Sequence, residues 1–335
     1  MATIKEVAAA AQLSPSTVSI VLKGNGDARK ISRETQEKVL DWARKLGYTP
    51  NMQAKVLRGG VSSNAVITLF WAIDIRAHIL SRFLSGLQSA LLEHDYPCEL
   101  QIKPYKSNHL EEAISSRTLL GSNGMIVCNA SEADMAFLEN AQFHIPAVLY
   151  NRYSKRYSTI NMDDRTIGAL PARVFAGHSR KRPALLKVPA TFRGMDIRTG
   201  LFEQECRLAG MAPPVAIPVS DDMEGGYKGA SALCAADCLP DCLFCTSDEV
   251  AYGALKAFYQ HAVRIPEQIE IISVGNGSPE QQKFSIPSLS VIYLPMEEMA
   301  AACLKTVYDS LTSFDLSVSA VEFPIRYIAR ESCPQ

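Results

Sequence analysis

The chain has 335 residues, enough for two or three domains with sizeable hydrophobic cores. With 47% hydrophobic and 21% charged residues it has an ordinary globular composition, and no stretch approaches the roughly 18 continuous apolar residues of a membrane helix. The net charge of −1 is unevenly distributed: residues 1–60 contain ten Lys and Arg against five Asp and Glu, whereas the rest contains 24 against 30. A small basic part of charge +5 beside a larger acidic part of charge −6 favours phosphate binding by the small part alone.

Three short helices are predicted at the N-terminus. Apolar residues recur with helical spacing at Ile4, Val7, Ala8 and Ala11. Thr3 and Glu6 have the spacing of a capping box for this first helix. The second helix is expected over Pro15–Lys23 and the third over Ser32–Gly47, with Ser32 as its N-cap. Two helices joined by a tight turn and braced by a third can present the second helix to a DNA major groove.

These helices carry the motifs of a known family. The matching segments are Thr3–Ala8, Leu13–Ser14, Thr17–Ser19, Val21–Leu22, Ile31–Ser32, Glu34–Thr35, Lys38–Val39 and Leu46–Asn51, followed by Ala54 and Leu57–Arg58. In these residues the chain resembles the LacI/GalR family of bacterial repressors, which fold a short hinge helix on their operator. The resemblance implies an all-α helix-turn-helix headpiece over residues 1–48, then a hinge helix and linker over residues 49–62.

The resemblance also implies which residues of the second helix contact DNA. The side chains that face away from its apolar stripe belong to Ser16, Thr17, Ser19, Ile20 and Lys23. They would meet base edges and phosphates, and Ser14, which starts the helix, belongs to the same expected interface. The alternative is an ordinary solvated helix face.

Ile20 departs from the family, which usually has arginine at this position. Arginine makes paired hydrogen bonds with guanine, whereas isoleucine offers only apolar contact, for example with a thymine methyl group. We therefore expect an operator half-site that differs from the common family sequence.

The loop Gly24–Lys30 is longer than is typical and places Arg29 beside the third helix. Each phosphate that a basic side chain neutralises releases counterions, so added phosphate contact is the preferred interpretation. A solvated turn is the alternative.

In the hinge, Asn51 is placed to cap a helix over Met52–Arg58. A helix this short is marginal alone and needs a partner surface. By resemblance, Leu57 is an apolar wedge for the minor groove, Ala54 permits close approach and Lys55 lies near a phosphate. An ordinary core leucine is the alternative role of Leu57.

The nine cysteines do not indicate a cofactor. Cys238, Cys242 and Cys245 have the C-x3-C-x2-C spacing that resembles a radical-SAM motif, and Cys234 precedes them. The predicted elements divide these residues among a helix, a loop and a strand, so buried structural thiols are preferred. The odd count argues against a disulfide framework, and zinc lacks a second cysteine pair or a nearby histidine. We expect no metal and no cofactor.

From Asn64 onward, apolar strand-like runs alternate with helical patterns. Strands are expected over Ala65–Ala72, Glu99–Lys103, Met125–Cys128, Ala147–Leu149, Thr159–Met162, Pro183–Lys187, Leu243–Cys245 and Ile269–Val274. Helices are expected over Phe83–Leu92, Leu110–Leu120, Ala133–Ala141, Ile167–Ala176, Leu201–Leu208, Tyr227–Ala235, Val250–His261 and Met296–Leu311. This alternation predicts parallel sheets flanked by helices, in two α/β lobes because one sheet would be too large. A ligand is expected in a cleft between the lobes, beyond the carboxyl ends of the strands.

Residues 65–330 resemble the effector domain of the same family, which is related to the type 1 periplasmic sugar-binding proteins. The matching residues are Met162–Asp164 with Gly168, Gly177–Arg180, Arg198 with Phe202 and Gly210, Thr246–Gly253, Pro266–Glu267 and Ile286–Leu289. The resemblance implies an effector-binding and dimerisation domain over residues 63–335. Its first lobe is expected at about 63–161 plus 291–320, and its second at about 162–290 plus 321–335.

The candidate effector-binding residues are Trp71, Asp74, Asn151, Arg198, Ser247 and Asn276. By alignment with the family, the planar guanidinium of Arg198 would grip effector oxygens; a surface salt bridge is the alternative. Asp74 and Asn151 follow strands and match polar ligand positions.

The other candidates depart from the family pattern. Ser247 replaces the usual asparagine, and Asp248 is expected to cap a helix that begins at Glu249. Where the family presents an acidic residue, this chain has Gly275 or Asn276. The ring of Trp71 either stacks on a sugar or is buried.

The sequence thus predicts a ligand-responsive, sequence-specific DNA-binding regulator and not an enzyme, because no nucleophile elbow, Walker loop or HExxH pattern is present. We expect a homodimeric repressor of a carbohydrate or nucleoside operon, with a pseudo-palindromic double-stranded operator and a sugar-like effector as partners. The chain has no terminal leucine heptad repeat, so no tetramerisation segment is expected. The absence of an N-terminal signal peptide favours a cytoplasmic, nucleoid-associated protein. The alternatives are control by a protein partner, a silent effector cleft, or a sugar-binding module without regulation.

Overall fold

The computed structural model describes most of the chain as two compact units. The described residues are 3–22, 26–27, 29–46, 48, 65–73, 79–114, 119, 121–313 and 315–335. The first unit comprises Met1–Asp74, Ser85–Asn161 and Met299–Val321, and the second unit comprises Ile75–Leu84, Met162–Glu298 and Glu322–Gln335. The second unit therefore continues to Glu298, past the lobe change expected at residue 290, and also includes a short segment before residue 85.

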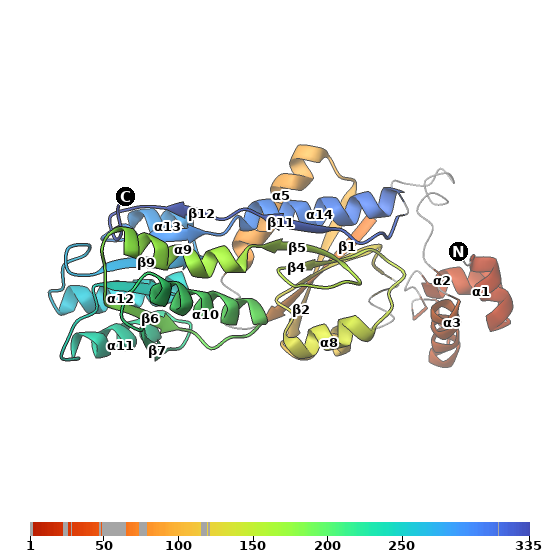
Figure 1. The fold of residues 1–335 in the computed structure, drawn as a ribbon. Helices are drawn as coiled ribbons and strands as arrows, with labels where there is room; N and C mark the ends of the chain where they lie inside the picture. Colours follow the sequence, from red (N-terminus) through yellow and green to blue (C-terminus); the bar gives the residue numbers. More distant parts are fainter. Residues whose placement is uncertain are drawn as a thin grey trace. The chain divides into compact units, whose positions relative to one another are not determined.

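The headpiece, residues 3–48, contains the three expected helices (Figure 1). They are α1 Ile4–Ala11, α2 Pro15–Leu22 and α3 Arg33–Lys45. Thr3 caps α1, and its side chain forms the expected capping box with Glu6. The buried core consists of Val7, Ala8, Ala11, Val18, Val21, Leu22, Val39 and Ala43. Because each helix contributes to this one core, the three helices depend on one another for burial of their apolar faces.

The sheet of the first unit has six strands in the order β11-β5-β4-β3-β1-β2. In chain order the strands are β1 Ala65–Ile73, β2 Cys98–Lys106, β3 Gly124–Cys128, β4 Ala147–Tyr150, β5 Ser158–Met162 and β11 Ala320–Phe323. The strands from β2 to β5 are parallel to their neighbours. The helices that alternate with these strands or follow them are α5 Leu80–His94, α6 Leu110–Ala113, α8 Glu132–Asn140 and α14 Met296–Ser313.

The second unit has a sheet of the same size, in the order β12-β10-β9-β8-β6-β7. Its strands are β6 Pro183–Lys187, β7 Val215–Pro218, β8 Cys242–Cys245, β9 Glu270–Gly275, β10 Ser290–Tyr293 and β12 Arg326–Ile328. The strands from β6 to β10 are parallel to their neighbours, whereas β12 runs antiparallel to β10. The prediction of two helix-flanked parallel sheets is therefore confirmed, with one antiparallel edge pair that it did not include.

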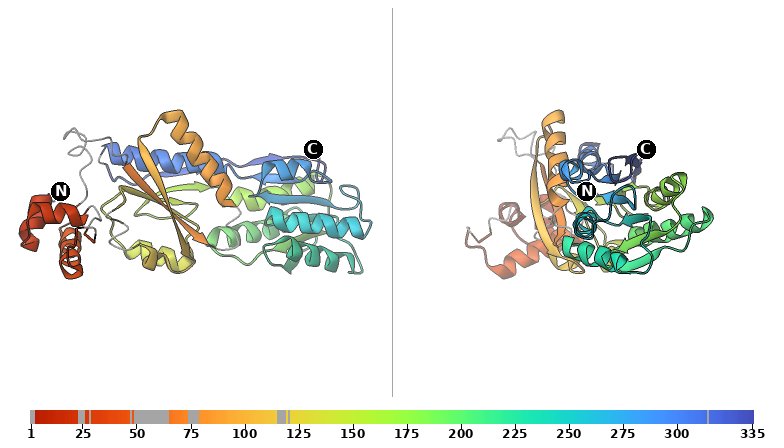
Figure 2. Two further views of the ribbon diagram at one scale, coloured as in Figure 1. Left: turned by 180° about the vertical axis from the view of Figure 1, so that it is seen from behind. Right: turned by 90° about the vertical axis from the view of Figure 1, so that its left-hand side faces the viewer.

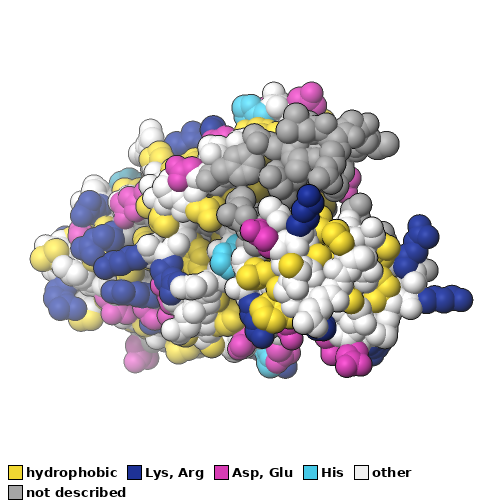
Figure 3. All heavy atoms as spheres, turned by 90° about the vertical axis from the view of Figure 1, so that its right-hand side faces the viewer, with side chains coloured by type: hydrophobic (Ala, Val, Ile, Leu, Met, Phe, Trp, Pro, Cys, Tyr) yellow, Lys and Arg dark blue, Asp and Glu magenta, His cyan; other side chains and the backbone are white. Residues whose placement is uncertain are grey.

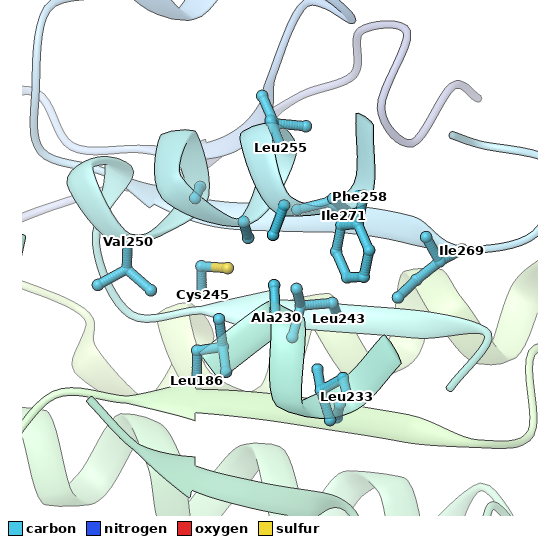
Figure 4. Packing of buried hydrophobic residues seen from close by; sticks show 14 of the residues in the cluster. Leu186, Ala230, Leu233, Leu243, Cys245, Val250, Leu255, Phe258, Ile269 and Ile271 are labelled. Carbon is cyan, nitrogen blue, oxygen red and sulfur yellow. The ribbon is translucent and has the colours of Figure 1, made fainter. Parts of the chain in front are cut away.

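Helices cover both faces of the second sheet (Figures 1 and 2). They are α9 Asp164–Gly177, α10 Arg193–Leu208, α11 Met223–Cys234, α12 Asp248–Gln260 and α13 Pro279–Phe284. Leu243 and Cys245 of β8 pack in one apolar cluster with residues of α11 and α12 (Figure 4). Phe244, between them, packs on the opposite face, where its ring lies 5.0 Å from that of Phe202 on α10. Both faces are buried, which explains why β8 is apolar throughout.

The two sheets repeat one strand order. In each sheet, the strand that comes second in the chain lies at one edge, beside the first strand: β2 beside β1, and β7 beside β6. The later parallel strands follow on the other side of the first strand, and the strand nearest the C-terminus, β11 or β12, forms the opposite edge. The order reverses between β1 and β3 and between β6 and β8, and ligands of such folds bind beyond the carboxyl ends of the strands at this reversal. Among the described residues, no helix is long and apolar enough to cross a membrane.

Candidate DNA-binding and effector-binding sites

Ser14 fixes the start of α2. Its hydroxyl accepts a hydrogen bond from the backbone N–H of Thr17 at 3.0 Å and lies 2.8 Å from the Thr17 hydroxyl. A side-chain oxygen here satisfies one of the free N–H groups of the first helical turn. Ser14 is therefore primarily a capping residue, and any DNA contact that it makes comes in addition.

The two faces of α2 differ as expected from the sequence. The buried residues are Val18, Val21 and Leu22. Ser16 is exposed, and Thr17, Ser19 and Ile20 are partly exposed on the other face. This face offers hydroxyl groups beside one apolar side chain, which suits mixed phosphate and base-edge contact.

Gln36 of α3 ties the preceding loop to the headpiece. Its amide nitrogen donates to Asp27 Oδ1 at 2.9 Å and to the carbonyl of Ile31 at 2.8 Å. A Cβ atom at Gly26 would lie only 2.4 Å from the Gln36 side chain, so the loop fits closely against it. Arg29, in the same loop, is exposed, as phosphate contact requires.

Six predicted site residues lie outside the described residues. They are Lys23, Asn51, Ala54, Lys55, Leu57 and Asp74. The hinge hypothesis, including the wedge role of Leu57, therefore stays a prediction. Figure 3 shows one face of the protein, on which Lys and Arg side chains, in dark blue, project into solvent at several separate places.

Arg198 has a partner that the sequence did not reveal. It lies on α10, is 8% exposed, and its Nε donates to Asp164 Oδ1 at 2.7 Å. Its Nη2 is also 2.7 Å from that oxygen, and the guanidinium stands 5.7 Å from the Phe192 ring centre. Nη1 makes no hydrogen bond or ion pair within the described residues. The ion pair is buried, unlike the surface salt bridge that was the alternative, and it leaves Nη1 over, so the effector-binding role of Arg198 stays a prediction.

The start of α12 corrects one prediction. Ser247, not Asp248, caps this helix, and the helix begins at Asp248. The Ser247 hydroxyl accepts from the N–H of Val250 and donates to the carboxylate of Asp221. Ser247 is 2% exposed, so the main role of its hydroxyl is to cap α12 and to bond to Asp221. A serine caps as well as an aspartate, and the residue types alone did not decide between the two positions.

Asp248 organises the loop that follows β9. Its Oδ2 accepts from the N–H of Gly277 at 2.8 Å and from the Gln282 amide at 2.7 Å. Burial raises the pKa of Asp248 to about 6, against the opposing effect of these hydrogen bonds. Asn276 lies in this loop, and its Oδ1 accepts from the N–H of Asp248 at 3.3 Å. Asn276 is thus held beyond the carboxyl end of β9, where an effector residue is expected.

The first sheet contributes Asn151 and Trp71. Asn151 directly follows β4, is partly exposed and has a left-handed backbone with φ of 52°. Its Oδ1 is buried and has no hydrogen-bond partner in the described chain. Such an atom is costly to bury unless something pairs with it, so Asn151 stays a candidate for effector contact. Trp71 lies within β1 and is 2% exposed, so of its two predicted roles, stacking on a sugar or burial in the core, the structure shows burial.

The cysteines with radical-SAM-like spacing do not converge. Cys242 and Cys245 are the first and last residues of β8, so their side chains point to opposite faces of the sheet, while Cys238 is exposed outside it. Cys245 lies in the apolar cluster beside Leu243 and Val250 (Figure 4). Burial raises the pKa of the Cys242 and Cys245 thiols far above the ordinary range, so both are inert core residues.

Two known protein families match parts of the chain, and curated relatives match nearly all of it. Residues 3–51 match the family described as bacterial regulatory proteins, lacI family, and residues 172–333 match the periplasmic binding protein-like domain. The probable HTH-type transcriptional repressor ExuR of Bacillus subtilis is 26% identical, over 97% of this chain and 98% of that protein. The ribose operon repressor of Haemophilus influenzae is 25% identical, over 99% of this chain and 98% of that protein.

Two solved structures give the same result. A LacI family transcription regulator from Clostridium acetobutylicum has a TM-score of 0.75 and 31% identity, and the match covers 80% of this chain and all of that one. The lac repressor dimer bound to operator and the anti-inducer ONPF has a TM-score of 0.71 at 17% identity, over 100% of this chain and 99% of that one, and supports the fold alone. The headpiece match and the identity to the Clostridium regulator agree: the chain belongs to the LacI family of bacterial regulatory proteins, which are DNA-binding transcription regulators and not enzymes.

Proposed function

We propose that this protein represses a carbohydrate or nucleoside utilisation operon, as a homodimer on a pseudo-palindromic operator, in the cytoplasm and on nucleoid DNA. The observation that carries the proposal is the headpiece, in which α2 presents hydroxyl groups and Ile20 on the face opposite its core. The names of the full-length relatives support repression, and one of them is a repressor of a ribose operon. The lac repressor, of similar fold, was solved as a dimer on its operator.

The effector is proposed to be a sugar or a sugar derivative, and its binding needs no cofactor. In the second unit, Arg198 offers Nη1 and Asn276 stands beyond β9. In the first unit, taken by itself, Asn151 offers a buried Oδ1 without a hydrogen-bond partner among the described residues. A few fixed donors and acceptors of this kind suit a ligand with several hydroxyl groups, each of which can donate and accept. The effector controls repression only if it binds one state of the dimer more tightly than the other.

The test is selection of genomic fragments by the purified protein, repeated with pentoses, hexoses, nucleosides and purine bases. One recurrent pseudo-palindrome beside catabolic genes, and one ligand class that changes its affinity, would support the proposal. Binding without any preferred sequence would contradict it. A preferred site that no ligand affects would refute effector control and favour control by a protein partner.

A single substitution sharpens the DNA half of the proposal. Ile20 cannot make the paired hydrogen bonds that arginine makes with guanine. We expect Ile20→Arg to add a preference of about 5- to 100-fold for guanine at one position of each half-site, measured by competition with base-substituted operators. Ser19→Ala serves as the control, since it should weaken binding without creating a guanine preference. A wild-type operator with strict guanine dependence at this position would show that residue 20 is assigned wrongly.

A further inference from the structure

Three side chains of kinds that bind metals meet at the amino end of the second sheet. His178 follows α9, Glu270 begins β9 and Cys333 lies near the C-terminus. The Nδ1 atom of His178 lies 3.0 Å from Glu270 Oε2. The Cys333 sulfur lies 3.5 Å from the same oxygen and 3.8 Å from His178 Nδ1. One nitrogen, one oxygen and one sulfur therefore form a small triangle.

The size of this triangle fits tetrahedral coordination. Bonds of zinc to nitrogen, oxygen and sulfur of roughly 2.0 to 2.3 Å imply separations of roughly 3.3 to 3.7 Å between ligand atoms in a tetrahedron. The three separations of 3.0, 3.5 and 3.8 Å lie within about 0.3 Å of that range. An ion at this place requires only small side-chain movements.

We propose that His178, Glu270 and Cys333 bind a zinc ion. Imidazole and thiolate favour zinc over calcium and magnesium, which prefer oxygen ligands. His178 has a side chain that is 27% exposed, whereas the side chain of Glu270 is 6% exposed and Cys333 is fully buried. The His178 side is thus the route of entry, and water completes the coordination there.

Neighbouring groups hold the proposed ligands in place. Arg180 Nη2 donates to Glu270 Oε1 at 3.0 Å, which leaves Oε2 as the oxygen nearest to both other ligands. The backbone N–H of Cys333 donates to the Ser290 hydroxyl at 3.0 Å. Partners of this kind orient carboxylate ligands in known metal sites. A buried hydrogen-bonded cluster with no ion is the competing interpretation, because Arg180 already neutralises Glu270.

The sequence gives no local signal for this group, because its members stand at 178, 270 and 333. Zinc-finger ligands stand close together along the chain, and these three residues do not, so the sequence alone led to the expectation of no metal, which this proposal revises. Folding of the second unit brings the three together. The proposal is independent of the identity of operator and effector.

The experiment uses the full chain, treated with chelator and kept reduced, and titrated with Zn²⁺ and with Co²⁺ as an optical probe. We expect one equivalent to bind, with a thiolate-to-cobalt charge-transfer band and a higher Tm of the second unit. Cys333→Ser should bind at least about tenfold more weakly and lose the band. Cys238→Ser, which removes an exposed thiol outside the cluster, should match the wild type.

X-ray absorption of the zinc-loaded wild type gives a result that does not depend on how a variant folds. One sulfur and three nitrogen or oxygen neighbours would support the site. Absence of sulfur, two or more sulfur neighbours, or a cobalt band that survives Cys333→Ser and disappears in Cys238→Ser would overturn it.

Discussion

The headpiece and the second unit differ in the hydrogen bonds that stabilise each of them: the partners are close in sequence in the headpiece and far apart in sequence in the second unit. In the headpiece, Thr3 bonds to Glu6 and Ser14 to Thr17, each pair three residues apart. In the second unit, two of the buried bonds that organise the candidate effector site join residues 34 positions apart, Arg198 to Asp164 and Gln282 to Asp248. Short-range bonds follow from sequence spacing, whereas long-range bonds appear only once the chain has folded. Loss of a short-range bond and loss of a long-range bond should also lower the free energy of unfolding by different amounts.

The largest effect is expected for Arg198→Ala. This change leaves the Asp164 carboxylate, 2% exposed, without its cation, at a cost of about 3 to 5 kcal/mol in the free energy of unfolding of the second unit. Hydrogen exchange of peptides from β6 to β9 in increasing urea measures the loss. The double variant Arg198→Ala/Asp164→Ala should recover part of it, since the buried charge is then gone.

An exposed ion pair on the same two helices provides the control. Arg173 on α9 and Glu205 on α10 lie 3.0 Å apart, and the Arg173 side chain is 64% exposed. Arg173→Ala should cost far less stability than Arg198→Ala, because solvent screens an exposed ion pair. Equal losses for Arg173→Ala and Arg198→Ala would contradict the view that burial makes the Arg198 pair important.

A smaller, pH-dependent effect is expected for Asp248→Asn. The pKa of Asp248 is raised in the folded protein to about 6 from 3.8, so the favourable contribution of its protonated form is present at low pH and lost as the pH rises through about 6. Asparagine keeps an oxygen for Gly277 and Gln282 and carries no charge. The variant should therefore be more stable than the wild type by about 3 kcal/mol at pH 8, and by about half of that at pH 5.

Thermal unfolding of both proteins across this pH range tests the prediction. The control is Asp222→Asn, which removes a hydrogen-bonded carboxylate whose pKa is lowered, so that this variant should be less stable at pH 8. An advantage of Asp248→Asn that is the same at every pH would rule out ionisation of Asp248 as the cause.

The smallest effect is expected in the headpiece, for Ser14→Ala. Loss of the N-cap hydrogen bond to Thr17 should cost about 1 kcal/mol of headpiece stability. The fluorescence of Trp42, which packs against the headpiece core, reports its unfolding. Ser16→Ala should leave stability unchanged and weaken operator binding, because Ser16 is exposed on the outer face of α2. If both variants melt alike, the role assigned to Ser14 is wrong.

The sequence predicted most of the buried elements but missed most of the sheet edges and one buried inner strand, β10, whose four residues are too few to form a clear apolar run. The expected strand Pro183–Lys187 coincides with β6, whose first four residues are buried. The edge strand β7, Val215–Pro218, was not predicted, because its side chains are mostly exposed and form no apolar run. β11 and β12 were missed for the same reason. α13 was also missed, although Ser278–Pro279 repeats the start signal of Ser14–Pro15, because the helix has only six residues.

For the candidate sites, the sequence predicted residue types and not partners. Family motifs identified Arg198 and Asn276, but their contacts with Asp164 and Asp248 depend on tertiary packing. Asp164 carried a usable signal, since it stands inside the Met162–Asp164 motif, yet nothing local connects it with α10. A position in a motif therefore predicts where a polar side chain lies better than it predicts what the side chain binds.

The edge strand β12 stands near the C-terminus, so the second sheet can be completed only after nearly the whole chain has been translated. Translation delivers the headpiece first: its buried core residues lie between Val7 and Ala43, and Tyr48 packs against them. The second sheet waits for Arg326–Ile328, which pair with β10 only after the chain has passed through Met299–Val321 of the first unit. Until then the edge of β10 is open to pairing with other strands. The three helices of the headpiece are thus translated well before the strand that completes the second sheet.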